Sequence, residues 1–339
     1  MHSFLDPAIL FFAFGILAGC VKSNLEIPQP IARFLSLYLL MALGLKGGFA
    51  LAQSGFTTEI AASLGAAVLL AIVVPMIAWQ VLKRLVPPFD AAAVAATYGS
   101  VSAVTFITAT QYLDVQGIAY GGHMAAAMAL MESPAIVIAV VLANTLRQSA
   151  GAPVVLASGN TLALAGPAAG TGTGTGTGLG KILHESFTDG TQLLLLGAMA
   201  VGLLTGEAGK EAMAPFSIDL FKGMLAFFLL DMGLLTARNL GKLRGQSRWL
   251  LAYAVGAPVV HAGLAMALAL LLGLTAGNAA LLMVLASSAS YIAVPAVLRH
   301  AIPEANPAVY FSMSLGMTFP LNILLGIPAY TWVAGAVLG

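Results

Sequence analysis

Two clusters of small polar residues interrupt apolar stretches of the chain, one at Gly99–Thr105 and the other at Ser287–Pro295. Small residues and proline allow a membrane helix to open, and the opening frees backbone N–H groups at the start of the following half-helix. About half a positive charge resides at such a helix start, so it attracts anions. The two clusters together therefore predict an anion-binding site in the middle of a membrane.

The polar side chains of the two clusters are the predicted substrate ligands. They are Ser100, Ser102, Thr105, Ser288, Ser290 and Tyr291. The competing interpretation is that serines and threonines in membrane helices bond back to the preceding turn or to a neighbouring helix. Because the two clusters occupy equivalent positions of a sequence repeat, described below, we expect a binding site.

A carboxylate inside an apolar stretch is the second feature that could do chemistry. An ionised side chain at the centre of a bilayer costs about 2.5–3.5 kcal/mol on insertion scales, so it needs a partner or water. We expect Glu132 to bind the coupling cation or a proton, with Ser287, Thr318 and Asn322 as neighbours. The alternative is a protonated Glu132 that is hydrogen-bonded across a helix contact. Asp231 is a further candidate, which no repeat position supports.

Composition indicates a polytopic α-helical membrane protein. Of the 339 residues, 60% are hydrophobic and 8% are charged, and apolar runs long enough to cross the roughly 30 Å hydrocarbon layer recur along the chain. A net charge of +1 gives no reason to expect a nucleic-acid partner. The sequence contains no nucleophile elbow, HExxH motif or complete phosphate loop, and His123 and His261 lack a second ligand at metal spacing. We therefore expect neither an enzyme nor an organic cofactor.

Apolar length and the breaks at charged, proline or glycine clusters place ten spans in the sequence. They run roughly over 4–20, 31–53, 57–83, 90–112, 118–146, 191–206, 216–240, 247–274, 277–299 and 307–336. Lysine and arginine accumulate in cytoplasmic loops. With the N-terminus outside, all of the 14 Lys and Arg residues except Lys46, Lys210 and Lys222 fall on the cytoplasmic side. The sequence thus predicts a multi-pass protein of a bacterial inner membrane with both termini outside, in the periplasm.

The second half of the chain repeats the first. Ser102 and Pro134 have counterparts in Ser290 and Pro320, and all the matched positions keep offsets of 183 to 189 residues. Each copy holds an odd number of spans, so the two copies have opposite orientations in the membrane, as in many secondary transporters. We expect the fifth and tenth spans to kink at their prolines.

The predicted fold is therefore all-α and polytopic, with ten transmembrane helices in two inverted five-helix repeats. The repeats are 1–149 and 186–339, and a flexible cytoplasmic Gly/Thr-rich linker at 150–185 joins them. Gly15-x-x-x-Gly19 and Gly44-x-x-x-Gly48 predict close approach of neighbouring helices.

The most distinctive residues lie in the fourth, fifth, ninth and tenth predicted spans and their connections. They are Gly99-x-Val101-Ser102-x-x-Thr105, Pro134-Ala135, Val140-Val141-x-Ala143-Asn144, Ala286-Ser287-Ser288-x-Ser290, Leu298-Arg299, Ile302-Pro303-x-Ala305-Asn306-Pro307 and Tyr310. This set resembles the sodium-dependent bicarbonate transporter family of cyanobacteria. The resemblance implies a substrate-carrying core and a scaffold or gate unit, a homotrimer, and sodium and bicarbonate bound between the helix breaks. It also implies a PII-like signalling protein on the cytoplasmic face, as in some members.

The chain departs from that family pattern at the second cluster. Where the family resembles Ser-Ser-Ser-Ser-Asp-Ile-Ser-Gly-Pro-Pro, the acidic position is Tyr291, a neutral phenol at physiological pH. Ala103 and Val104 stand where the family resembles Gly-Ser. The departure removes a negative charge that offsets dehydration of a bound sodium ion, while Glu132 keeps a carboxylate nearby in the sequence.

The predicted function is secondary active transport of a small anion by alternating access, most closely that of a sodium-dependent bicarbonate symporter in a lipid membrane. Two alternatives stay open. One is a proton-coupled or uncoupled carrier or channel for a small organic acid, such as a carboxylate larger than bicarbonate that Tyr291 could contact. The other is a transport-inactive sensor on the same fold.

Overall fold

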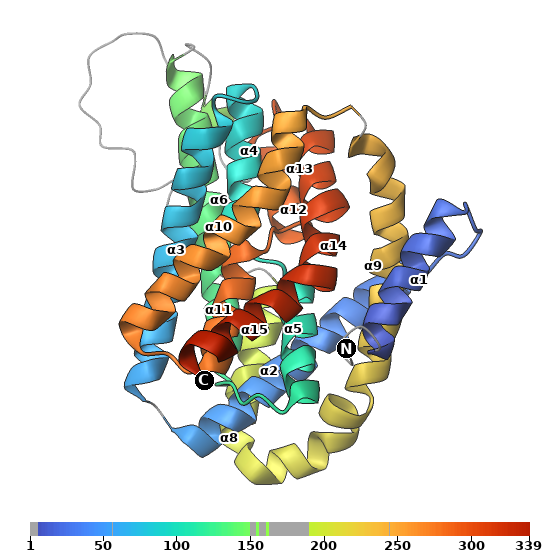
Figure 1. The fold of residues 1–339 in the computed structure, drawn as a ribbon, viewed down its shortest axis with the longest axis vertical. Helices are drawn as coiled ribbons and strands as arrows, with labels where there is room; N and C mark the ends of the chain where they lie inside the picture. Colours follow the sequence, from blue (N-terminus) through green and yellow to red (C-terminus); the bar gives the residue numbers. More distant parts are fainter. Residues whose placement is uncertain (1–5, 56, 150–153, 156–160, 163–189, 244) are drawn as a thin grey trace.

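The computed structural model describes residues 6–55, 57–149, 154–155, 161–162, 190–243 and 245–339. These residues are almost entirely helical (Figure 1). The predicted linker at 150–185 lies outside the described residues, apart from two short strands. The strands are β1 (Val154–Val155) and β2 (Thr161–Leu162), which pair antiparallel.

The helices follow one another as two series. The first series is α1 (Pro7–Cys20), α2 (Gln29–Ser54), α3 (Thr58–Leu82), α4 (Pro88–Gly99), α5 (Ala103–Gln116) and α6 (Met124–Ser149). The second is α8 (Gly190–Ala214), α9 (Phe221–Leu243), α10 (Arg248–Leu272), α11 (Ala276–Ser287), α12 (Ala293–Ala301), α13 (Pro307–Met313), α14 (Phe319–Leu321) and α15 (Ile327–Leu338). Three π-helical turns interrupt the second series, namely η2 (Pro215–Asp219), η3 (Ser314–Thr318) and η4 (Asn322–Gly326).

The apolar helices confirm an all-α polytopic membrane protein. Within the described part of the chain, seven helical stretches are long and apolar enough to cross a membrane. One of them, Gly190–Gly241, covers two predicted spans, and its backbone leaves the helical conformation at Gly206, where φ is 56°. Pro7–Cys20 and Ala276–Ser287 are shorter apolar helices. The count of ten spans and their inversion stay predictions.

Glycines bring α1 against α9 and α2 against α8. A Cβ atom at Gly15 would lie 3.0 Å from the Cα atom of Gly233, and one at Gly48 would lie 2.9 Å from the Cα atom of Gly202. Such spacing leaves no room for any side chain, so the backbones themselves are in contact. The close approach predicted from the two glycine motifs is confirmed. In Figure 1, α1 and α9 lie side by side, apart from the bundle that contains α3, α4 and α10.

The other helices form the bundle around the two polar clusters. Alanine dominates α4, and every residue from Ala91 to Gly99 is buried. Gly99 packs against the ring of Pro75 in α3, where a Cβ atom would overlap the proline ring. Small side chains therefore let the first polar cluster sit at the centre of the packed bundle.

The two prolines expected to kink their helices have different surroundings. Pro134 lies inside α6, which continues past it. Pro320 lies in the short helix α14, between η3, which ends at Thr318, and η4, which begins at Asn322. π-Helical turns free backbone groups from the regular ladder and occur often at functional sites. The last span is thus irregular over a longer stretch than one proline kink would produce.

Candidate functional site

Both predicted helix breaks are present. α4 ends at Gly99 and α5 begins at Ala103, while α11 ends at Ser287 and α12 begins at Ala293. Figure 1 shows α4 and α12 in one half of the molecule and α5 and α11 in the other, with the breaks between them. The two broken helices therefore meet in the middle of the bundle.

Direct hydrogen bonds join the two breaks. The backbone N–H of Ser102 donates to Ser288 Oγ over 2.9 Å, and the backbone N–H of Ser290 donates to the Thr97 carbonyl oxygen over 2.7 Å. All four residues are buried. Ser102 and Ser290 lie close together, as the anion-site hypothesis requires.

Several hydroxyl groups of the clusters follow the competing interpretation. Ser287 Oγ donates to the Val284 carbonyl oxygen over 3.1 Å, and Ser288 Oγ donates to that of Leu285 over 2.9 Å. Both bonds run back to the preceding turn. Both side chains therefore bond within the end of α11. Ser100 also lies in the break, and its buried hydroxyl has no hydrogen-bond partner among the described residues.

The start of α5 offers free donors. Ser102 Oγ caps the helix by accepting the Thr105 N–H over 3.2 Å, and it also accepts the Thr105 hydroxyl over 2.9 Å. The preceding N–H groups, of Ala103 and Val104, have no hydrogen-bond partner in the described part of the chain. Helix starts with free N–H groups bind anions because the donors and the helix dipole act together.

A small cavity adjoins these donors. It has a volume of about 60 Å³, and Ala103, Val104, Ser102, Ser290 and Tyr291 are among its lining residues. Pockets for drug-sized ligands measure about 300–1,000 Å³. The small cavity therefore has the scale of a small ion.

Glu132 also lines the small cavity, and its carboxylate accepts a hydrogen bond from Gln192 Nε2 over 2.9 Å. Glu132 belongs to α6 and Gln192 to α8, so this bond connects the bundle to the glycine-packed helices. The structure thus brings Glu132 together with the predicted substrate ligands.

The predicted neighbours of Glu132 form other contacts. Asn322 Nδ2 donates to the Ser287 carbonyl oxygen over 2.9 Å, and Thr318 Oγ1 lies 2.6 Å from Tyr98 Oη. The described residues that line the small cavity do not include Ser287, Thr318 or Asn322. Asn322 thus joins the last span to the end of α11, and Thr318 joins it to α4.

Tyr291 separates the small cavity from a much larger one. Its hydroxyl donates to Met232 Sδ over 3.7 Å, and its ring meets that of Phe319 edge-on with centroids 5.0 Å apart. Only 6% of Tyr291 is exposed. Tyr291 and Ile292 line both cavities, so the second break forms part of the wall between them.

The large cavity has a volume of about 1140 Å³ and carries charged residues. Arg33 of α2, Asp231 of α9 and Arg299 of α12 line it, together with Tyr291. The two arginines belong to the side predicted to be cytoplasmic. This cavity leads from that side to the region of the helix breaks.

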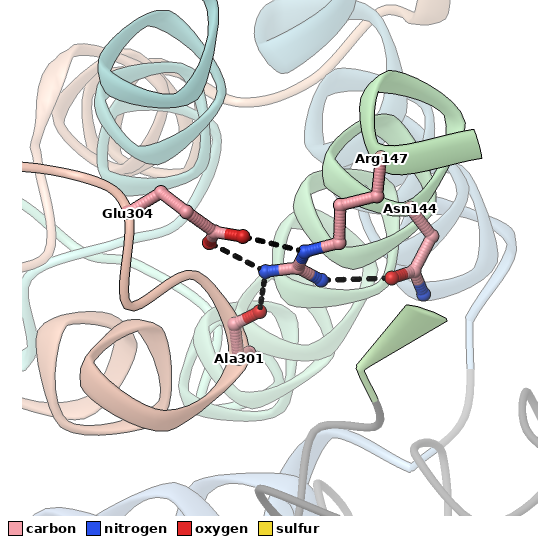
Figure 2. Close-up of polar contacts among 4 residues, drawn as sticks. All are labelled: Asn144, Arg147, Ala301 and Glu304. Carbon is pink, nitrogen blue, oxygen red and sulfur yellow. Dashed lines mark hydrogen bonds and ion pairs between the residues drawn. The ribbon is translucent and has the colours of Figure 1, made fainter. Parts of the chain in front are cut away.

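The sequence analysis did not predict a buried cluster around Arg147. It used Arg147 only as one of the positive charges that place a loop on the cytoplasmic side. Figure 2 shows its guanidinium held between Glu304, Asn144 and the carbonyl oxygen of Ala301. The bonds to Glu304 are bidentate, at 2.8 and 2.7 Å, and Arg147 is only 1% exposed. The fixed fork of arginine suits this geometry.

The cluster joins the end of α6 to the loop between α12 and α13. The hydrogen bonds from Arg147 hold the pKa of the Glu304 carboxyl below its usual range. The sequence signals for this cluster are Arg147, at the end of an apolar span, and Glu304, in a loop of the second half of the chain. No local pattern pairs Arg147 with Glu304, because 157 positions separate them.

Comparison with known proteins gives one finding that covers nearly the whole chain. A family model described as the Na+-dependent bicarbonate transporter superfamily matches residues 7–335. No curated protein matches the chain closely enough to be counted as a relative.

Proposed function

We propose that this chain, which belongs to the Na+-dependent bicarbonate transporter superfamily, is a secondary active transporter that carries a small anion by alternating access. The closest activity is that of a sodium-dependent bicarbonate symporter. The family is one of transporters, which points away from an enzyme. We propose bicarbonate as the substrate, sodium as the coupling ion and alternating access as the mechanism.

The proposed anion site is supported chiefly by the geometry at the two helix breaks. Two broken helices meet at their breaks, and a cavity of about 60 Å³ there is lined by Ala103 and Val104, whose N–H groups have no partner among the described residues. A small anion fits this site because donors at a helix start need no counter-charge from a side chain. Ser102, Ser290 and the Tyr291 side chain would complete its surroundings.

Two equivalent hydrogen bonds support the inverted repeat. Asp90, the third residue of α4, accepts the backbone N–H of Asn306 over 2.6 Å. Asn278, the third residue of α11, accepts the backbone N–H of Gly121 over 2.7 Å. In each case the first half of a broken helix caps the start of the last helix of the other repeat. A two-fold relation between the repeats produces such exchanged pairs.

The helix packing has the same exchanged form. α1, the first helix of the first repeat, packs on α9, the second helix of the second repeat. In the same way α2, the second helix of the first repeat, packs on α8, the first helix of the second. We assign these four helices to the scaffold and the bundle with the breaks to the moving core. In alternating access the core moves against the scaffold around a fixed site.

One ion pair bridges the proposed scaffold and the proposed core. Lys46 of α2 forms an ion pair with Asp114 of α5 over 2.8 Å, between the scaffold and the core. The large cavity lies on the other side of the helix breaks, next to Arg33 and Arg299. Opening toward the outside would require the Lys46–Asp114 pair to separate.

Glu132 is the proposed ligand for the coupling cation. Its carboxylate faces the small cavity and meets Gln192 of the scaffold over 2.9 Å. A cation bound there would neutralise an intramembrane carboxylate beside the anion. Cation and anion would then occupy the site together, which is the requirement for symport.

The remaining parts of the proposal rest on the family resemblance. They are a bacterial inner-membrane location with both termini outside, a homotrimer, and a PII-like signalling protein on the cytoplasmic face. Leu204, Leu271 and Trp332 are 85%, 83% and 73% exposed, which suits a surface in contact with lipid or with other subunits.

Uptake into proteoliposomes tests the proposal. Bicarbonate and short carboxylates are offered with and without an inward sodium gradient. We expect bicarbonate uptake that the sodium gradient increases. Uptake of no anion under any gradient would contradict transport and favour the sensor alternative.

A second candidate function follows from Tyr291. Because the family's acidic residue is absent there, a proton-coupled or uncoupled carrier for a small organic acid is the alternative. Uptake of a short carboxylate at a rate that does not depend on sodium would favour the organic-acid carrier over bicarbonate symport.

A further inference from the structure

Asp231 is a buried carboxylate at the wall of the large cavity that the anion site does not use. It is 7% exposed and lies in α9, inside an apolar stretch long enough to cross a membrane. Among the described residues it makes no hydrogen bond and no ion pair. A carboxylate in a membrane interior is expensive unless it is protonated or paired, and such residues mark ion or proton pathways.

The charged and titratable groups around Asp231 come from four elements, namely α2, the second helix break, α12 and α9 itself. Arg33 of α2, Tyr291 of the second helix break and Arg299 of α12 line the same cavity. Arg238, two turns further along α9, acts on Asp231 electrostatically. The residues that α13 and η3 contribute to the cavity wall are apolar, namely Pro307, Ala308, Phe311 and Leu315.

These surroundings suit a proton better than a metal ion. A metal ion needs several converging oxygen, nitrogen or sulfur ligands. The described residues contain no group of three His, Cys, Asp or Glu side chains that could hold one. The Tyr291 hydroxyl is directed to Met232 Sδ. Asp231 is thus a single carboxylate with room beside it.

We infer that Asp231 is a proton-binding site whose protonation accompanies the admission of an anion to the large cavity. A carboxylate oxygen takes the proton from hydronium in the cavity and forms an O–H bond, which leaves water. The ionised carboxylate repels an incoming anion, whereas the protonated form does not, and the two arginines then attract the anion unopposed. Anion binding and proton binding favour each other by the same factor.

The anion step of this inference rests on the proposed transport function, but the proton site itself can be tested alone. The full-length protein in lipid nanodiscs is treated with dicyclohexylcarbodiimide, which modifies protonated carboxyl groups in apolar surroundings, and labelled peptides are mapped by mass spectrometry. We expect Asp231 to be labelled at mildly acidic pH and much less at mildly alkaline pH. Asp231→Asn removes this label, and Asp219→Asn, at an exposed carboxylate in η2, retains it.

Anion uptake by the Asp231→Asn variant is the second test of the proton site. In proteoliposomes, Asp231→Asn should reduce pyruvate or bicarbonate uptake driven by an inward proton gradient about tenfold, while uptake down the anion's own gradient continues. An unlabelled Asp231, a label that ignores pH, or an unchanged response of the variant to the proton gradient would overturn the inference. If the wild type carries neither anion, the proposed function fails, and the labelling still decides whether Asp231 binds a proton.

Discussion

The backbone N–H of Ser102 in the first helix break donates to the Ser288 hydroxyl in the second over 2.9 Å. This bond is buried and connects positions 186 residues apart in the sequence. Ser288 Oγ in turn donates to the Leu285 carbonyl oxygen, so one hydroxyl ties the end of α11 to the start of α5. Together with the backbone bond from Ser290 to Thr97, this hydroxyl holds the two breaks against each other.

Ser288→Ala should lower stability and weaken anion uptake. The variant leaves the buried N–H of Ser102 without its acceptor, which costs about 1–3 kcal/mol. Thermal unfolding of the purified protein measures the loss. Ser63→Ala is the matched control, because the buried Ser63 hydroxyl has no partner among the described residues, and its removal should change stability little. Equal melting temperatures for the two variants would contradict a structural role for the Ser102–Ser288 bond.

Glu132→Gln should abolish the stimulation of uptake by the coupling cation. Glutamine keeps the size and can still bond to Gln192, but it removes the negative charge that faces the small cavity. Uptake in proteoliposomes with and without the cation gradient gives the measurement. Glu211→Gln, at an exposed position of α8, is the control and should retain the full response. A Glu132→Gln protein that still responds to the cation would remove this residue from the coupling site.

The sequence predicted the helix breaks but not the grouping of polar residues around them. A polar cluster in an apolar run is a local signal, so Gly99–Thr105 and Ser287–Pro295 could be found without a structure. Glu132 and Thr318 each lie two residues before the matched prolines Pro134 and Pro320, and the sequence predicts that they are neighbours. Ser102 and Ser290, which also hold matched positions, both line the small cavity, whereas Thr318 contacts Tyr98 and does not line that cavity.

Contacts between distant segments explain what the sequence missed. Arg147 bonds to Glu304 across 157 residues, and neither residue lies in a local pattern that names the other. Glycine motifs were informative because close helix packing requires small residues wherever the partner helix lies. They predicted close approach, and only the structure shows that α1 meets α9 and α2 meets α8.

Gly48→Ala should destabilise the scaffold. The added methyl group would overlap the Met199 carbonyl oxygen of α8, and overpacking of this kind costs about 1–3 kcal/mol. Thermal unfolding in detergent detects the change. In contrast, Gly263→Ala in α10 meets no atom within 4 Å and should leave stability equal or slightly higher, because alanine favours a helix over glycine. Equal effects of the two substitutions would show that the α2–α8 contact is looser than its geometry indicates.

Stability should fall in acid through the Arg147–Glu304 pair. Arg147 holds the pKa of Glu304 below its ordinary value, so the ionised carboxylate is more favourable in the folded protein than in the unfolded chain. The contribution is fully present above the unfolded pKa of about 4.3 and is lost as the pH falls through the lower folded value. Because the Glu304 side chain is 37% exposed, solvent screening keeps the effect modest.

Glu304→Gln separates this contribution from general acid unfolding. The amide keeps one acceptor for Arg147 but cannot ionise, so the buried guanidinium loses its counter-charge at every pH. At neutral pH we expect a loss of about 1–3 kcal/mol, below the 3–5 kcal/mol for a fully buried pair. Melting temperatures of wild type and variant should converge as the pH falls toward the folded pKa of Glu304. A constant gap between the two melting curves down to that pH would show that ionisation of Glu304 contributes nothing to holding α6 against the α12–α13 loop.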